Sequence, residues 1–300
     1  MSLLQASLRI VAPFAPGGAT DFVAHLIAAE LARGMQMPVT IRNEPGAGGT
    51  RGAAIAAHAA PDGHTLVMGT SSTHGICTAV FECVPYDPIG DFAPVALIAT
   101  APNVLVVAAD SGYHDVQSIV RAAQAAPGLL TYGSAGYGQT IHVCGALFAE
   151  LAGVELTHTP QAGSAAALER LCAGGITMMF DSVLSALPYI RAGRLRALAI
   201  TAAGRIPALA EVPALAEVGF PDYDLTVWLG LLCPAATPRQ TIADFNTRIN
   251  AILRAPDIRD NLALLGARTE AQSTVAFAHL IETNAARWHA AVARARVARR

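Results

Sequence analysis

Two glycine-containing segments carry the residues best suited to binding an anion. They are Phe14–Asp21 (FAPGGATD) and Tyr132–Thr140 (YGSAGYGQT), and each stands between a strand-like apolar run and a helix-like run. A strand, a glycine turn and a helix in this order bring free backbone N–H groups and the positive end of a helix dipole to one point. Such a point binds a phosphate or a carboxylate without any cationic side chain. Two such turns, far apart in the sequence, predict two half-sites that face each other.

Polar residues at the ends of other predicted strands are further candidates for ligand contacts. Asp181 ends an apolar strand and precedes Ser182, where a helix is expected to start. It could cap that helix, contact a ligand, or do both, because ligands of open α/β sheets bind at the carboxyl ends of strands. Ser71 and Thr73 follow the strand Thr65–Gly69 in the same way. Trp228 could belong to the core or form the wall of a cleft.

Other kinds of site are poorly supported by the sequence. Gly133-Ser134-Ala135-Gly136 has its serine one place too early for a hydrolase elbow. From Gly46, a dinucleotide-binding pattern would place Arg51 where its third glycine belongs. The nine histidines and five cysteines show no metal-ligand spacing, so no metal or cofactor is expected. Cys77 and Cys83 could form a disulfide or remain free thiols.

The composition predicts a folded protein with a large core. Of the 300 residues, 53% are hydrophobic and 14% are charged, and the net charge of −2 gives no basis for binding nucleic acid. All twenty cationic side chains are arginine, which excludes Schiff-base chemistry and a phosphate-binding lysine. No apolar run reaches the roughly 18 residues that span a bilayer. The printed sequence begins without a signal peptide, but Met1-Ser2-Leu3 resembles an added leader, so export remains open.

The sequence alternates between strand-like and helix-like segments, which predicts βαβ units and mostly parallel sheets. Strands are expected at Leu8–Ala12, Val39–Arg42, Thr65–Gly69, Asn103–Ala108, Leu129–Gly133, Leu156–Thr159, Met178–Asp181, Arg196–Thr201 and Leu225–Cys233. Helices are expected at Asp21–Arg33, Gly49–Ala60, Val116–Ala126, Gln139–Ala152, Ser164–Ala173, Gln240–Ala255 and Val275–Arg296.

Repetition of the strand–turn–helix unit near residues 14 and 134 predicts two similar α/β lobes. We expect residues 1–100 and 226–300 to form the first lobe and residues 101–225 to form the second. Extended crossings near Val95–Val104 and Leu225–Leu232 would join the lobes, and the C-terminal helices would return to the first lobe. The ligand would lie in the cleft between them.

Motifs along nearly the whole chain together resemble the Bug-type receptors of tripartite tricarboxylate transporters. The matching segments are Pro13–Asp21, Asn43–Gly49, Pro61–Leu66, Tyr86–Phe92, Tyr132–Gly136, Met179–Asp181, Gly193–Ala199, Val212–Pro213 and Trp228. The resemblance implies a two-lobed, Venus-flytrap fold like that of type II periplasmic binding proteins, with each lobe a mostly parallel sheet flanked by helices. It also implies a monomeric periplasmic receptor, not an enzyme, that delivers a small carboxylate or related metabolite to membrane transporter subunits.

The resemblance assigns ligand contacts to both glycine turns and implies that Asp181 can meet a ligand amino group. One departure from the family pattern is Thr159-Pro160-Gln161-Ala162-Gly163, where relatives usually read Val-Pro-Tyr-Lys-Gly. Gln161 should therefore alter specificity. The expected ligand-binding residues are Phe14, Ala15, Gly17, Gly18, Ala19, Thr20, Ser71, Thr73, Ser134, Gly136, Gln139, Thr140, Gln161 and Asp181.

Two alternatives to a transport receptor remain at this point. A sensory partner would bind the same ligand but carry no flux, and the sequence does not separate it from a transport receptor. A small-molecule α/β enzyme is the second alternative, and the absence of a hydrolase elbow and the defective dinucleotide pattern argue against it.

Overall fold

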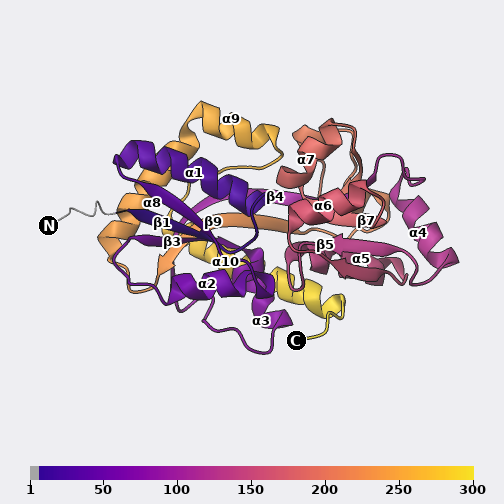
Figure 1. Ribbon diagram of the computed structural model, residues 1–300, viewed down its shortest axis with the longest axis horizontal. Coiled ribbons are helices and arrows are strands. Elements are labelled where there is room, and N and C mark those ends of the chain that lie inside the picture. The colour runs from indigo at the N-terminus through magenta and orange to yellow at the C-terminus, as the bar shows by residue number, and fades with distance from the viewer. Residues whose placement is uncertain (1–6) are drawn as a thin grey trace.

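The computed structural model describes residues 7–300 as an α/β protein with two lobes (Figure 1). Its strands are β1 (Leu8–Ala12), β2 (Val39–Asn43), β3 (Thr65–Thr70), β4 (Phe92–Ala108), β5 (Thr131–Ser134), β6 (Thr157–Pro160), β7 (Met178–Ser182), β8 (Leu195–Ile200) and β9 (Thr226–Pro234). Its α-helices are α1 (Ala19–Met35), α2 (Thr50–Ala57), α3 (Cys77–Val80), α4 (Val116–Ala125), α5 (Thr140–Ala152), α6 (Ser164–Cys172), α7 (Val183–Arg191), α8 (Arg239–Arg254), α9 (Pro256–Leu264) and α10 (Thr274–Arg294).

The strands are ordered β2-β1-β3-β9-β4-β7-β5-β6, with β8 also paired to β4. Strands β1, β2 and β3 belong to the first lobe, and β5, β6, β7 and β8 belong to the second. Parallel pairing joins β1 to β2 and β3, and β5 to β6 and β7, as the strand–helix alternation predicts. The antiparallel pairs all involve β4 or β9, which run between the lobes.

The two crossing strands hold the lobes together. The first part of β4 pairs with β9, from Phe92 opposite Pro234 to Pro102 opposite Thr226. The second part of β4, from Asn103, pairs with β7 and β8. The β4–β9 register shifts twice, between Pro94 and Ala96 and between Leu97 and Ala99. Both predicted crossings are present, while the lobe boundaries assigned from the sequence remain a prediction.

Apolar side chains fill the interior of both lobes. Ile10, Ile27, Leu66 and Ile249 belong to a core cluster of the first lobe, built by β1, α1, β3 and α8. The C-terminal helices were predicted to return to the first lobe, but the end of α10 lies against the second lobe. Trp288 of α10 belongs to the same buried cluster as Phe148 of α5, so this helix also packs against the second lobe.

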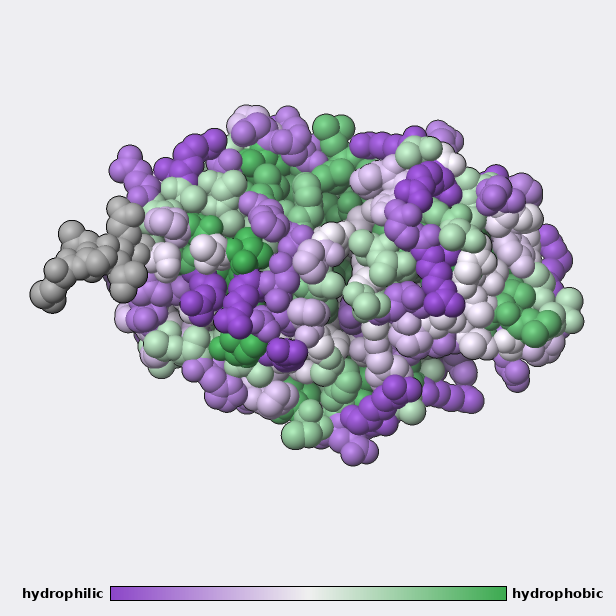
Figure 2. All heavy atoms as spheres, in the orientation of Figure 1, coloured by the Kyte–Doolittle hydropathy of each residue, from purple (hydrophilic) through white to green (hydrophobic). Residues whose placement is uncertain are grey.

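The surface shown in Figure 2 mixes hydrophilic and hydrophobic residues, with apolar atoms in small scattered areas. No helix within residues 7–300 combines the length and the apolar character needed to cross a membrane. Five free cysteines are present, and Cys77 is buried whereas Cys83 is exposed. The Cys77 thiol donates to the Thr73 carbonyl oxygen at 3.1 Å, so the disulfide considered from the sequence is not formed.

Candidate functional site

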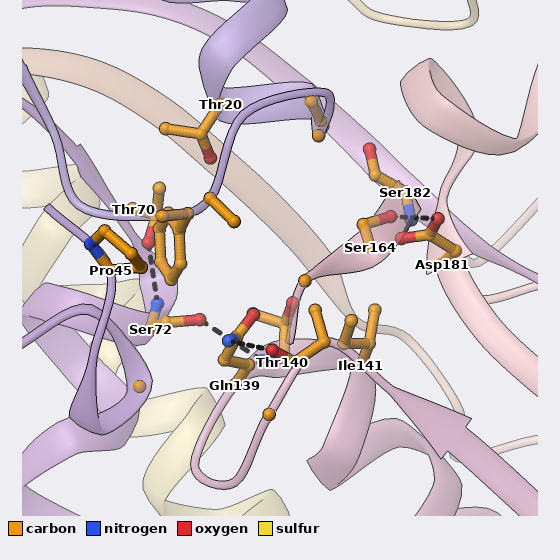
Figure 3. Close-up of a pocket in the computed structure, with 18 of the residues that line it drawn as sticks. Thr20, Pro45, Thr70, Ser72, Gln139, Thr140, Ile141, Ser164, Asp181 and Ser182 are labelled. Atoms are coloured by element: carbon orange, nitrogen blue, oxygen red, sulfur yellow. Dashed lines mark hydrogen bonds between the residues drawn. The ribbon is translucent and has the colours of Figure 1, made fainter. Parts of the chain in front are cut away.

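A cavity of about 430 Å³ lies between the lobes and is lined by the turns that follow several strands (Figure 3). The predicted residues in its wall are Phe14, Ala15, Gly18, Ala19, Thr20, Gly136, Gln139, Thr140, Gln161 and Asp181. Residues that the sequence analysis did not assign include Pro45–Gly48, Thr70, Ser72, Phe81, Asn103, Ser164, Ser182 and Ser185. The structure thus brings both glycine turns and Asp181 to one cavity.

The first glycine turn presents the amino end of α1 to the cavity. Gly17 has a φ of +83°, which favours glycine, and Gly18 is the N-cap residue of α1. Gly18 has no side chain to cap the helix, so the first-turn N–H groups of Ala19 and Thr20 have no capping acceptor within residues 7–300. The helix begins at Ala19, two residues before the predicted start, and this places its free amides in the cavity wall.

Asp21 stabilises this turn from inside the first lobe. One carboxylate oxygen accepts the Gly17 N–H at 2.9 Å, and the other accepts the Asn43 side-chain amide at 2.8 Å. The same Asn43 amide donates to the Phe14 carbonyl oxygen at 3.1 Å. These bonds fix the backbone of the turn in one shape, so its amides are already oriented before a ligand arrives.

The second glycine turn presents the amino end of α5 in the same way. Gln139 is the N-cap residue, and its side chain makes no capping bond; its amide donates instead to the Ala135 carbonyl oxygen at 2.9 Å. His142 is buried, and its Nδ1 accepts the Gly138 N–H at 3.3 Å. Burial lowers the pKa of His142 to about 3, with the nearby His158 and Arg300 contributing. A neutral imidazole therefore supports the turn.

Four predicted residues lie beside the cavity and not in its wall. Ser134 Oγ accepts the Gly136 N–H at 3.2 Å and lies 2.6 Å from His158 Nε2, so this hydroxyl builds the turn. Ser71 Oγ accepts the Trp228 N–H at 3.3 Å, and Thr73 Oγ1 donates to the Thr70 carbonyl oxygen at 3.2 Å. Gly17 shapes the turn through its backbone. None of these four residues lines the cavity: hydrogen bonds within the protein hold the three hydroxyls, and Gly17 has no side chain.

Trp228 belongs to the core, whereas its neighbours Val227 and Leu229 line the cavity. The Gln161 side chain lies in the wall but is held by its own lobe. Its amide nitrogen donates to the Thr159 carbonyl oxygen at 3.2 Å, and its Oε1 accepts from Arg170 at 3.4 Å.

Asp181, Ser164 and Ser182 lie on the opposite side of the cavity from Thr70 and Ser72 (Figure 3). Ser185 also lines the cavity and donates to Asp181. Asp181 Oδ2 accepts the hydroxyls of Ser164 at 2.5 Å and Ser185 at 3.1 Å, and Oδ1 accepts the Ser182 N–H at 2.9 Å. Burial raises the pKa of Asp181 to about 6, although these three hydrogen bonds oppose the shift. The N-cap residue of α7 is Ser182, so the N-cap role considered for Asp181 is wrong.

The cavity wall contains no arginine or histidine among the described residues. Asp181 is its one carboxylate in that same part of the chain. An anionic ligand must therefore be held by neutral donors, N–H groups and hydroxyls, and by the dipoles of α1 and α5, each equivalent to about half a positive charge at the amino end. The geometry suits a carboxylate, which backbone amides bind well at helix N-termini.

The lobes touch each other around the cavity. Ser72 Oγ of the first lobe accepts the Thr140 N–H of the second lobe at 3.2 Å. At a second point, a methyl group added to Gly163 would lie 2.9 Å from the Ala15 Cβ. At a third, one added to Gly48 would lie 3.2 Å from the Gly138 carbonyl oxygen. At these three points the two lobes are in contact, so the structure has them in a closed arrangement.

Ser72→Ala should weaken ligand binding by roughly two- to tenfold, because a neutral hydrogen bond contributes about 0.5–1.5 kcal/mol and this one joins the lobes. Most of the change should appear as faster ligand dissociation, measured by surface plasmon resonance. Ser71→Ala is the matched control, since that hydroxyl bonds Trp228 inside the protein and should affect the melting temperature only. Equal affinity losses in both variants would contradict a specific role for the interlobe bond.

Comparison with known proteins identifies relatives over almost the whole chain. A family model described as "Tripartite tricarboxylate transporter family receptor" matches residues 23–296. A protein described as "UPF0065 protein in tcbD-tcbE intergenic region", from Pseudomonas sp. (strain P51), is 39% identical over 93% of this chain and 83% of its own length. Protein BugT of Bordetella pertussis is 30% identical over 87% of this chain and 80% of its own.

Solved structures agree with these sequence matches. Rpa4515 of R. palustris, determined with adipate, superimposes with a TM-score of 0.96 at 32% identity and covers 100% of both chains. MatC from Rhodopseudomonas palustris, determined with bound malate, gives a TM-score of 0.91 at 36% identity and covers 95% of this chain and 98% of its own. Both the fold and the resemblance inferred from the motifs are thereby confirmed.

Proposed function

This chain belongs to the tripartite tricarboxylate transporter receptor family, and on that premise we propose that its cavity binds a small organic carboxylate. Members of the family are solute-binding receptors and not enzymes. The observation that carries the proposal is the convergence of two helix amino ends on a cavity whose described wall has no cationic side chain. Neither N-cap residue caps its own helix, and at α5 only the Thr140 N–H is taken within the described chain, by Ser72 of the other lobe. Such a site favours an anion small enough to be reached by backbone N–H groups from both lobes.

The two glycine turns act together on the ligand. Amides of Ala19 and Thr20 reach it from α1, and Gln139 and the first turn of α5 reach it from the other lobe. Charge-assisted hydrogen bonds are shorter and stronger than neutral ones, which offsets the loss of hydration of the carboxylate. Adipate and malate in the two structural relatives are carboxylates, which supports this class of ligand.

Binding is coupled to closure of the lobes. We assign residues 1–100 and 226–300 to the first lobe and residues 101–225 to the second, with β4 and β9 as the connection. A ligand that contacts both turns has its highest affinity for the closed form, so it shifts the population toward that form. The closed receptor, a monomer in the periplasm, then delivers the carboxylate to the membrane subunits of its transporter.

Native mass spectrometry of the purified protein tests the ligand class directly. We expect a retained small acid, or, after stripping, a one-to-one adduct with adipate or malate. Binding of uncharged analogues, such as the corresponding dimethyl esters, with the same affinity in calorimetry would contradict a carboxylate site.

Closure gives a separate prediction. Stripped protein should show a smaller radius of gyration in small-angle scattering after adipate or malate is added, because the ligand bridges the lobes. Calorimetry on the same sample establishes that the site is saturated. Saturation without any change in the scattering curve would contradict ligand-driven closure while leaving the carboxylate site in place.

A further inference from the structure

Residues Ala298–Arg300, which follow α10, lie beside α3 where the two lobes meet (Figure 1). The Arg300 N–H donates to the Val80 carbonyl oxygen at 2.9 Å, and the Arg300 carbonyl oxygen accepts the Glu82 N–H at 2.7 Å. The Arg299 guanidinium donates to two further carbonyl oxygens of the same stretch, at 3.1 and 3.3 Å. Backbone and side-chain bonds therefore attach this short segment to the first lobe.

The same segment contacts Tyr137, which belongs to the second glycine turn and lines the cavity. The Tyr137 hydroxyl donates to the Ala298 carbonyl oxygen at 2.5 Å, so its proton is used within the protein. The guanidinium carbon of Arg300 lies 3.9 Å from the centre of the Tyr137 ring, which is the arrangement of a cation–π contact. The segment thus connects the second glycine turn to the α3 region of the first lobe.

Phe81, directly after α3, lines the cavity at the same place. A methyl group added to Gly138 of the second glycine turn would lie 2.7 Å from the Phe81 ring, and one added to Gly48 would lie 2.9 Å from it. The ring is therefore packed between one turn of each lobe. Because Ala298–Arg300 is bonded to the backbone on either side of Phe81, the segment also fixes the position of this ring.

The end of α10 directs the segment toward α3. Arg296 has a φ of +51°, in the left-handed region that residues other than glycine rarely adopt. Its N–H donates to the Ala293 carbonyl oxygen at 3.2 Å, and the Val297 N–H donates to the Val292 carbonyl oxygen at 3.3 Å, which is the bond pattern of a Schellman motif. The Arg296 side chain forms an ion pair with Glu150 of α5 at 3.1 Å. The turn that follows the helix is thus held by its own hydrogen bonds and by the second lobe.

We propose that residues Ala298–Arg300 act as a clasp, which holds the second glycine turn against the first lobe and slows the release of the ligand. The inference rests on the proposed function, because the ligand is taken to leave when the lobes separate. All three residues of the clasp are exposed, so its contacts can break and re-form without uncovering the core. Tyr137 and Arg300 are positioning residues: Tyr137 holds the turn through its hydroxyl, and Arg300 lies outside the cavity wall.

Tyr137→Phe and Arg300→Ala each remove one contact of the clasp. Dissociation of malate or adipate, measured by surface plasmon resonance, should become about two- to tenfold faster in Tyr137→Phe, which loses one hydrogen bond. It should become about two- to fivefold faster in Arg300→Ala, which loses the cation–π contact. Association should change little. In the double variant the effect should be smaller than the product of the two single effects, because both residues act on one contact.

Two variants outside the clasp are matched controls. Tyr189→Phe removes a hydroxyl that donates to Glu169 within the second lobe, and Arg259→Ala removes an exposed arginine that bonds Asp260 on α9. Neither should change the dissociation rate. Arg300→Lys retains a cation for the ring, so it should restore most of the wild-type rate. Dissociation rates of the two clasp variants equal to those of the controls would overturn the inference.

Hydrogen exchange measured by NMR tests the clasp without a ligand. In the wild type the backbone amides of Glu82 and Arg300 should be protected, because each donates or responds to a bond of the clasp. Tyr137→Phe should raise both exchange rates about two- to tenfold, although the lost hydroxyl belongs to the other lobe. Unchanged exchange at both amides would overturn the clasp. Failure of malate and adipate to bind would count against the proposed function alone, since exchange still decides the clasp.

Discussion

Ala19→Pro should lower the affinity for a carboxylate about 10- to 100-fold while leaving the fold intact, since one hydrogen bond to a charged group contributes about 1.5–3 kcal/mol. The substitution removes a single N–H group from the amino end of α1. Proline is well tolerated at the first position of a helix, where the missing N–H has no intrahelical partner. Gly18, with φ of −95° and ψ of 175°, already has the extended backbone that a residue before proline adopts.

Calorimetry with adipate and malate measures the effect, and the melting temperature reports on the fold. Ala19→Ser is the matched control, because it retains the N–H group at the same position. An affinity for the proline variant equal to that of the serine variant would show that the α1 amide does not hold the ligand.

Trp288→Ala should reduce the free energy of unfolding by about 3–5 kcal/mol, the range typical of replacing a large buried aromatic residue by alanine. Trp288 is fully buried in a cluster that also contains Val80 of α3 and Phe148 of α5. It lies on α10, so its loss leaves a cavity where this helix meets the second lobe. The change is measured by urea unfolding followed by circular dichroism.

Trp288→Phe separates the contribution of ring packing to stability from that of the buried indole N–H group. The indole Nε1 has no hydrogen-bond partner within the described chain, so phenylalanine removes a buried polar group along with part of the ring volume. Its loss of stability should be well below that of the alanine variant. A loss below about 1 kcal/mol for Trp288→Ala would mean that the end of α10 collapses onto the space or contributes little.

Local patterns predicted most elements because they agree with the packing. The strand at Leu8–Ala12 has the predicted bounds, and the helix predicted at Val116–Ala126 occurs at Val116–Ala125, where Asp115 forms a capping box with Ser118. The start of α1 differs because the helix has its N-cap at Gly18 and begins at Ala19, two residues before the predicted first residue, Asp21. The first part of β4 was not predicted as strand because Pro94 and Pro102 interrupt its pattern, and pairing with β9 overrides this local signal.

The site was predictable where its chemistry is local. Glycine turns followed by helices specify their own amide clusters, so Ala19, Thr20, Gln139 and Thr140 were found. Ser164 was missed because it approaches Asp181 only through the packing of α6 beside β7. Ser185 reaches the Asp181 carboxylate from the first turn of α7, whose start was not predicted precisely enough to place it. For Ser134 the residue type suggested a ligand contact, but the turn itself uses the hydroxyl.

The place of β9 in the strand order determines when the first lobe can be completed. β9 is inserted between β3 and β4, and Val67 of β3 pairs with Leu232 across a very long stretch of chain. Strands β5, β6 and β7 are synthesised earlier and can pair with one another without it. Until Pro234 has left the ribosome or the translocation channel, β3 and β4 each present an unpaired edge, which favours aggregation. A chain truncated before β9 should therefore aggregate unless a chaperone binds it. Such a chain would still contain both glycine turns, because they precede β9 in the sequence.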